Sequence, residues 1–259
     1  MKFIDAHAHL DRYSDELLPR VLEELDELQL LTIGVAMNPA SYTRTCALAA
    51  QSPWVLPTFG IHPWEATEYV DKLDTLWPLI DQSPMIGEIG LDFYWVEDRD
   101  TYPVQRRVFE FLMDAARSQQ KIVNMHTKEA EAEVVEALDR FKIERAIVHW
   151  YSGPLDIAKQ LVERGALFTF GVEIHTSELI QELARMVPLE LLLTETDNPG
   201  GLEWLRGEVG RPRHLPSVVK TLAQLRSMDA AELGEVIRAN FLRLIDGDPH
   251  LADVRARLL

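Results

Sequence analysis

Six residues whose side chains can bind metal ions each follow a short apolar run in this sequence. The first two, His7 and His9, belong to the N-terminal stretch DAHAHL, and the other four follow at intervals along the chain. Four imidazoles and two carboxylates can hold two divalent cations, and such cations lower the pKa of bound water to near neutrality. These residue types therefore predict a metal-dependent hydrolase. The candidate ligands are His7, His9, Glu88, His126, His149 and Asp197.

The apolar runs that precede these residues have the length and character of buried strands. Most are continuously apolar, as expected for strands that are covered on both faces. Segments with helical period separate them; in residues 14–30, Leu17, Val21, Leu25 and Leu28 recur at spacings of three and four. The expected strands are residues 3–6, 31–37, 55–61, 85–91, 122–125, 146–148, 166–170 and 191–193. The other expected helices are 103–119, 130–141, 155–163, 177–186, 216–226 and 230–244.

Strands that alternate with helices indicate parallel βαβ units, and eight such units predict an α/β fold of the TIM-type, a (β/α)8 barrel. The length of 259 residues and an apolar content of 47% fit one domain, residues 1–259. Active sites of these barrels lie at the C-terminal ends of the strands. Each candidate ligand follows an expected strand, and so does His62 after the third. His7 and His9 are two residues apart, so both side chains should point to the same side.

The charge of the chain disfavours simple nucleic-acid binding. Its 42 acidic and 26 basic residues give a formal charge of -16, which repels a phosphate polymer at long range. No stable nucleic-acid partner is therefore expected, although two divalent cations would create a local positive field.

No apolar run approaches the length of a membrane span, and the N-terminus lacks an export signal, so we expect no membrane partner and a cytoplasmic protein. The single cysteine, Cys46, lies in the expected helix TRTCALAAQ, where packing is its expected role.

The motifs around the candidate ligands resemble those of the TatD-type metal-dependent deoxyribonucleases. They are DAHAHL, GIHPW, GEIGLDFY, MHTKEA, HWYSG and TETDNP, and the resemblance extends from Asp5 to Asn240. The combination of GEIGLD with ETD and proline at the last strand is more specific than the HxH pair, which many amidohydrolases share. The resemblance implies a barrel with a two-metal centre that hydrolyses DNA phosphodiesters, often from an end.

Carried over onto this sequence, the resemblance implies that Glu88 bridges the two metals. His7, His9 and Asp197 would complete the shell of one ion, and His126 and His149 that of the other. Asp197 is the best candidate to accept the proton of the attacking water, so Asp197 and Glu88 are the expected catalytic residues. Imidazoles suit zinc or manganese, whereas magnesium prefers oxygen ligands, so magnesium, manganese and zinc all stay open.

The expected substrate-binding residues rest on weaker patterns. His62 could contact the substrate or only order a His-Pro turn, and Lys128 could contact phosphate where relatives often have arginine. The segment after Asp197 departs from the family pattern. Its arginines and tryptophan could contact phosphates and stack on bases, or they could form a solvated loop in which the arginines pair with Glu203 and Glu208. These residues are Trp204, Arg206, Arg211 and Arg213.

The segment 92–102 also combines aromatic and acidic residues. Tyr94, Trp95 and Arg99 could line the mouth of the site, while the acids of this segment would disfavour a long strand crossing it.

Three classes of function stay open on this sequence. The leading hypothesis is a phosphodiesterase that acts on single-stranded or frayed DNA ends through a metal-activated water. The second is a dinuclear-metal hydrolase of a small lactone, amide or phosphoester, because such barrels host many reactions. The third is a metal-bound module without catalysis in a larger assembly, against which the pairing of Glu88 with Asp197 argues.

Overall fold

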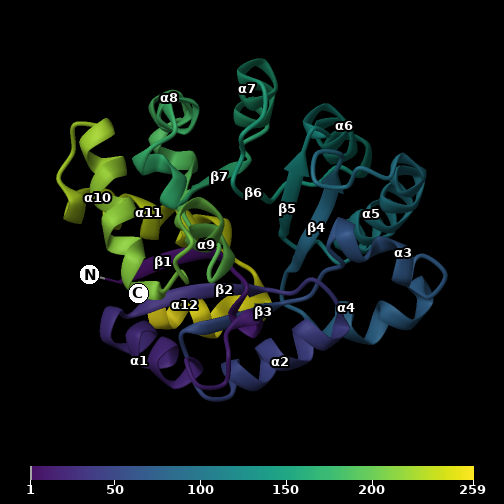
Figure 1. The fold of residues 1–259 in the computed structure, drawn as a ribbon, viewed down its shortest axis with the longest axis horizontal. Helices are drawn as coiled ribbons and strands as arrows, with labels where there is room; N and C mark the ends of the chain where they lie inside the picture. Colours follow the sequence, from purple (N-terminus) through teal and green to yellow (C-terminus); the bar gives the residue numbers. More distant parts are fainter. Residues whose placement is uncertain (1) are drawn as a thin grey trace. The chain divides into compact units, whose positions relative to one another are not determined.

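The computed structural model describes residues 2–259, which fold as two compact units (Figure 1). Unit 1 comprises Met1–Gly34, Cys46–Leu56 and Phe168–Leu259, and unit 2 comprises Val35–Thr45 and Pro57–Leu167. Boundaries between the units fall within helix α2 (Pro39–Ala49) and strand β3 (Val55–Thr58), before the last residue of β2 (Leu30–Val35) and after the first residue of β7 (Leu167–Phe170).

Unit 1 contains two pairs of parallel strands. Strand β1 (Phe3–Ala8) pairs with β2 (Leu30–Val35), and β7 (Leu167–Phe170) pairs with β8 (Leu192–Thr194). The Thr194 hydroxyl donates to the carbonyl of Ile4 at 2.6 Å, which connects β8 to β1. Nearly every residue of these strands is buried, as their continuously apolar sequences predict.

Helices of unit 1 cover these strands. The long helix α11 (Ala230–Leu244) buries Leu233, Ile237 and Phe241, and the Asn240 amide donates to the carbonyls of Leu189 at 2.7 Å and Leu192 at 2.9 Å. This side chain therefore supplies hydrogen bonds to the backbone beside β8. The other helices are α1 (Leu18–Leu28), α8 (Glu178–Met186), α9 (Gly200–Arg206), α10 (Leu215–Leu225) and α12 (Ala252–Leu258).

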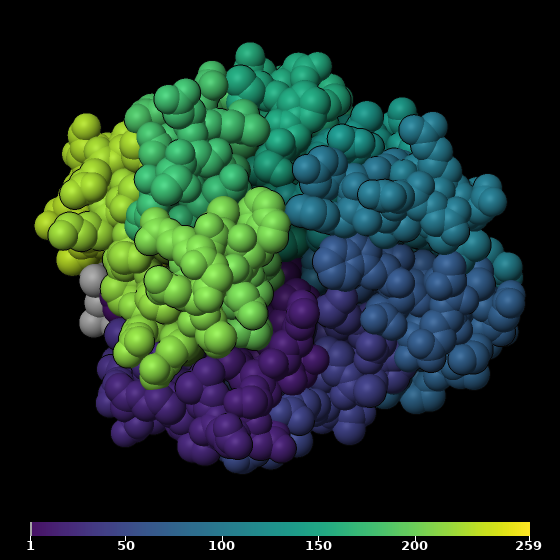
Figure 2. Space-filling model, in the orientation of Figure 1, coloured from purple at the N-terminus to yellow at the C-terminus, as the bar shows by residue number. Residues whose placement is uncertain are grey.

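Unit 2 contains the parallel strands β4 (Ile86–Asp92), β5 (Val123–Lys128) and β6 (Ala146–Val148) in that order. The register pairs Gly90 with His126, so ligand candidates of neighbouring strands lie at the same end. Helix α5 (Tyr102–Ser118) packs against β4 through buried apolar side chains, among them Leu112. The other helices are α3 (Ala66–Tyr69), α4 (Trp77–Gln82), α6 (Glu131–Phe141) and α7 (Leu155–Glu163). Residues of this unit form the blue and teal part of the surface in Figure 2.

The expected alternation of strands and helices is present throughout. Helix α1 begins at Leu18 rather than at residue 14, because residues 14–17 form a turn in which the Ser14 carbonyl accepts from the backbone of Leu17 and Leu18. Cys46 lies half-buried in α2 as expected. The segment after Asp197 was expected to be a loop, but residues 200–206 form helix α9, and the Gly201 N–H donates to the carbonyl of Asp197 at its start. Among the described residues, no helix is long and apolar enough to cross a membrane.

Candidate metal centre

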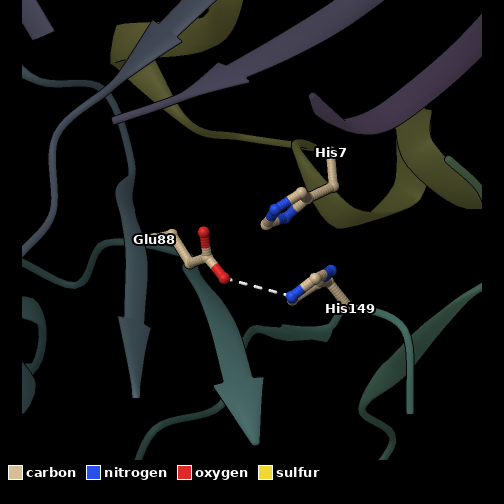
Figure 3. Close-up of side chains that lie close together, drawn as sticks. All are labelled: His7, Glu88 and His149. Atoms are coloured by element: carbon tan, nitrogen blue, oxygen red, sulfur yellow. Dashed lines mark ion pairs between the residues drawn. The ribbon is translucent and has the colours of Figure 1, made fainter. Parts of the chain in front are cut away.

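In unit 2, two buried imidazoles lie beside one carboxylate oxygen of Glu88. Glu88 lies within β4, His126 within β5, and His149 directly after β6. Oε1 of Glu88 is 3.0 Å from Nδ1 of His126 and 3.1 Å from Nε2 of His149, as Figure 3 shows for the second pair. The same two imidazole nitrogens are 3.3 Å apart. Two imidazole nitrogens beside a carboxylate form a donor set that suits a divalent transition metal.

Asp92 orients the imidazole of His126. Its Oδ2 lies 3.0 Å from Nε2 of His126, so that nitrogen carries the proton and donates to the carboxylate. The lone pair of the neutral ring then lies on Nδ1, the nitrogen that faces Glu88. A carboxylate behind a ligating histidine fixes the tautomer and raises ligand basicity. Asp92 was expected to be only a loop acid, although its spacing of four from Glu88 on β4 places both side chains on one face.

The hydrogen bonds of His62 place its proton on the nitrogen that faces Glu88. Its Nδ1 accepts a hydrogen bond from the backbone of Trp64 at 3.2 Å, so the neutral ring carries its proton on Nε2. That Nε2 lies 3.4 Å from Oε1 of Glu88. His62 is therefore a donor toward the site rather than a source of a ligand lone pair. Its bond to Trp64 also orders the His-Pro turn, one of the two alternatives raised for this residue, and contact with substrate stays a prediction.

Charges of the buried groups in unit 2 depend on one another. Burial alone lowers the pKa of the His126 imidazole, but its hydrogen bonds to Asp92 and Glu88 outweigh burial and raise that pKa. Burial alone raises the pKa of Asp92, yet hydrogen bonds from His126, Trp95 and Trp64 hold it below its ordinary value. Asp92 is therefore ionised and fixed in place.

Two glycines allow the backbone to approach these ligands closely. A Cβ atom on Gly60 would lie 2.2 Å from the carbonyl oxygen of Glu88. Gly90 has a φ of +154°, and a Cβ there would lie 1.9 Å from the carbonyl oxygen of His126. Both glycines belong to the quoted motifs GIHPW and GEIGLD, so these motifs have a steric reason as well as a chemical one.

In unit 1, the other three candidate ligands lie together. Nε2 of His9 is 3.5 Å and Nε2 of His7 is 3.8 Å from Oδ1 of Asp197. The backbone N–H of Asp197 donates to the carbonyl of His7 at 3.0 Å, and that of His9 donates to Asn198 at 2.7 Å. Two backbone hydrogen bonds thus hold the end of β1 against the segment after β8. They place the side chains of His7, His9 and Asp197 side by side.

Asp5, which was not among the residues predicted for the site, supports this cluster from within β1. Its carboxylate accepts from the Thr196 backbone at 2.8 Å and from the Thr196 hydroxyl at 2.6 Å. Burial raises the pKa of Asp5 to about 7, against the lowering effect of these two bonds. Asp5 thereby holds the residue next to Asp197, and alternation in the DAHAH motif, which places Asp5, His7 and His9 on one side, is the signal that could have identified it.

The expected substrate residues fall into two groups. Lys128 donates to the carbonyl of Trp150 and to the hydroxyl of Ser152, both at 2.9 Å, so it connects β5 to the segment after His149. Arg206 and Trp204 are exposed on α9, and the Trp204 residue is 59% accessible.

Arg211 and Arg213 do not pair with Glu203 or Glu208, the partners considered from the sequence. Both lie against Glu24 of α1, a buried carboxylate that forms an ion pair with the Arg211 guanidinium and lies 4.0 Å from Nε of Arg213. The Tyr13 hydroxyl donates to the carbonyl of Gly210 at 2.7 Å. These contacts anchor the segment after α9, and Glu24 lies too far away in sequence for spacing to reveal it.

Comparison with known proteins identifies the class to which this geometry belongs. The family model of TatD related DNases matches residues 4–246. The human protein named deoxyribonuclease TATDN3 is 27% identical over 96% of this chain and 96% of its own length. An uncharacterized metal-dependent hydrolase of Methanocaldococcus jannaschii is 26% identical over 93% of this chain and 95% of its own. The protein is a metal-dependent hydrolase of ester bonds, and the chain belongs to the TatD related DNase family.

Solved structures confirm the fold class. The crystal structure of YJJV, a TatD homologue from Escherichia coli K12, has a TM-score of 0.85 and 25% identity, and covers 93% of this chain and 97% of its own. A phosphotriesterase homology protein of Escherichia coli has a TM-score of 0.68 at 15% identity, over 92% of this chain and 97% of its own, which shows the shared fold alone. The predicted α/β fold of the TIM-barrel type is therefore correct.

The donor sets fit the metal that this family implies. Within unit 1, His7, His9 and Asp197 each offer a ligand atom within 4.8 Å of the others. Within unit 2, Nδ1 of His126 and Nε2 of His149 lie beside Oε1 of Glu88. Each group combines buried imidazole with carboxylate, the mixture that zinc and manganese accept.

Proposed function

We propose that this protein hydrolyses DNA phosphodiester bonds, removing nucleotides from single-stranded or frayed ends. The observation that carries the proposal is the cluster in unit 2, in which Asp92 turns Nδ1 of His126 toward Glu88 and His149. This arrangement supports a metal-assisted hydrolysis, and the name of the human relative supports DNA as its substrate.

We further propose that the chain holds two divalent cations. His7, His9 and Asp197 would bind one, and Glu88, His126 and His149 the other. Bound divalent cations would lower the pKa of water and neutralise charge on the phosphoryl oxygens. Magnesium, manganese and zinc are the candidates.

Three side chains have further roles in the proposed reaction. The Asp197 carboxylate, which lies beside the imidazoles of His7 and His9, accepts the proton of the attacking water. The His62 Nε2–H donates to a phosphoryl oxygen, because its Nδ1 is already bonded to Trp64. Asp92 holds His126 in the ligating tautomer.

A substrate panel tests the bond that is cleaved. End-labelled single-stranded and duplex DNA, a lactone, an N-acyl amide and a small phosphomonoester would each be assayed with magnesium, manganese and zinc. We expect turnover of DNA, faster on single strands, with products that shorten from one end. Turnover of the lactone or amide without DNA cleavage under any metal would contradict the proposal.

Metal stoichiometry tests the ligand assignment separately. Dialysed wild-type protein should contain two ions per chain by elemental analysis. Glu88→Gln should retain about one, because the unit 2 donor set loses its carboxylate, and Asp197→Asn should retain at least one. Equal metal content in Glu88→Gln and wild type would exclude Glu88 as a ligand.

A further inference from the structure

Three large aromatic side chains of unit 2 are exposed beside Asp92. Trp64, Tyr94 and Trp95 are 48%, 55% and 45% accessible, whereas the long apolar side chains of this unit are otherwise buried or half-buried. We call these three residues the aromatic surface. Exposed aromatic groups held in fixed positions are unusual on a monomer and mark binding sites.

Asp92 connects each member of the aromatic surface to the metal cluster. Its Oδ2 accepts from the Trp64 indole at 2.8 Å and from His126, and its Oδ1 accepts from the backbone N–H of Tyr94 at 3.0 Å and of Trp95 at 2.7 Å. One buried carboxylate therefore contacts a candidate metal ligand, the Trp64 ring and the backbone that carries Tyr94 and Trp95. A molecule lying on the aromatic surface would be placed within a few atoms of His126.

The segment that carries Tyr94 and Trp95 is preorganised by its own contacts. The Gln105 amide bonds to the backbone N–H and carbonyl of Asp92, at 2.9 Å and 3.1 Å. The Tyr102 hydroxyl donates to the carbonyls of Phe93 and Val96, both at 3.0 Å, and its ring stacks on Phe93. Because this order exists before a ligand binds, little conformational entropy is lost on binding.

Charge selects the part of a nucleic acid that can lie on the aromatic surface. Glu97, Asp98 and Asp100 follow directly in the chain and are exposed, against the single cation Arg99. These carboxylates repel a phosphodiester backbone, but a neutral, planar base can stack on aromatic rings. The surface therefore suits one base next to the reacting phosphate rather than a continuing strand.

We propose that the aromatic surface binds the nucleobase adjacent to the phosphodiester that is cleaved, and so restricts the enzyme to the last nucleotides of a strand. This inference rests on the proposed DNA hydrolysis and adds the residues that recognise the substrate. Tyr94 and Trp95 supply the stacking faces. Trp64 completes the surface and keeps Asp92 in place through its indole N–H.

A comparison of variants and substrates tests this role. Tyr94→Ala and Trp95→Ala remove rings but keep the backbone donors to Asp92, so the metal cluster should be preserved. Each should raise KM for a short single-stranded oligonucleotide roughly tenfold, with little change in kcat, as loss of one base–aromatic stack predicts. Trp95→Phe should recover most of this loss because a ring is restored. The control is Leu179→Ala, another exposed apolar side chain, in unit 1.

Abasic oligonucleotides distinguish stacking from a general effect on the fold. When the base beside the cleaved bond is missing, the KM of the wild type should rise by a similar factor. The KM of the two alanine variants should not rise further on this abasic substrate. The proposal would be overturned if the alanine substitutions raised KM equally on the intact and the abasic oligonucleotide, or if they changed KM on neither.

Failure of the proposed function would be recognised separately. If wild type cleaves no DNA with any metal, binding is measured by quenching of tryptophan fluorescence with deoxyadenosine monophosphate and with deoxyribose 5-phosphate. Quenching by the nucleotide alone, lost in Trp95→Ala, would support a base-binding surface on a hydrolase of another substrate. Equal quenching by deoxyadenosine monophosphate and deoxyribose 5-phosphate, or quenching by neither, would overturn the proposal of a base-binding surface.

Discussion

At the scale of single residues, Asp92 fixes the tautomer of His126 and so should affect metal affinity. Its Oδ2 accepts from two N–H groups, one on His126 and one on the Trp64 indole. Asp92→Asn keeps the shape but can present an NH2 group to these donors, which favours the other tautomer of His126 and removes the lone pair from Nδ1. We expect metal affinity to fall roughly 10- to 100-fold, as measured by competition with a chelating dye.

The matched control for this change is Asp71→Asn, an exposed carboxylate of the same unit whose side chain is 88% accessible. It should leave metal affinity unchanged. If Asp92→Asn bound metal as tightly as this control, His126 would not depend on Asp92 for its tautomer, and the ligand assignment would need another nitrogen.

At the scale of elements, α1 and the segment after α9 are joined by one buried charge. Glu24 is 2% accessible at its side chain and is paired with Arg211, while Arg20 lies 3.6 Å and Arg213 4.0 Å away. Arg211→Ala leaves this carboxylate buried with two weaker neighbours. We expect a loss on the order of 3 kcal/mol in the free energy of unfolding, measured by urea denaturation.

The exposed Arg206 of α9 provides the comparison for Arg211. Arg206→Ala should change stability by less than about 0.5 kcal/mol, since it removes no buried partner. Adding Glu24→Gln to Arg211→Ala should recover part of the loss by removing the unpaired charge. A DNA-specific rise in KM for Arg211→Ala, without loss of stability, would instead make Arg211 a phosphate-binding residue.

The same elements show how far the sequence could predict this protein. Strand ends were predictable because buried parallel strands are continuously apolar. The predicted ends placed His7, Glu88 and His126 close to their observed positions in β1, β4 and β5. Asp92 was missed because nearby aromatic and acidic residues suggested a loop, although β4 continues to it. The partner of Arg211 is 187 positions away, and only the fold brings such residues together.

At the scale of the whole molecule, metal binding should contribute to stability. Ligands that bind only the folded state stabilise it by about 2.7 kcal/mol at a hundredfold excess over Kd. For a chain of this size, removing metal with a chelator should lower Tm by roughly 5 °C, measured by calorimetry. The double variant Glu88→Gln with Asp197→Asn should show a much smaller shift. An equal shift in that variant would place the stabilising metal elsewhere.

The formal charge of -16 predicts an unusual response of DNA cleavage to salt. Proteins that bind DNA through many basic contacts lose affinity steeply as salt rises, with a slope near -0.9 for each phosphate neutralised. Here few cations are available and the surface repels phosphate, so binding should depend on the metal ions and on stacking. We expect the logarithm of KM for an oligonucleotide to rise with a slope below about 2 against the logarithm of salt concentration. Steady-state assays at fixed metal between low and moderate ionic strength would measure it. A slope above about 4 would indicate an extended basic contact surface and would contradict recognition confined to the end of a strand.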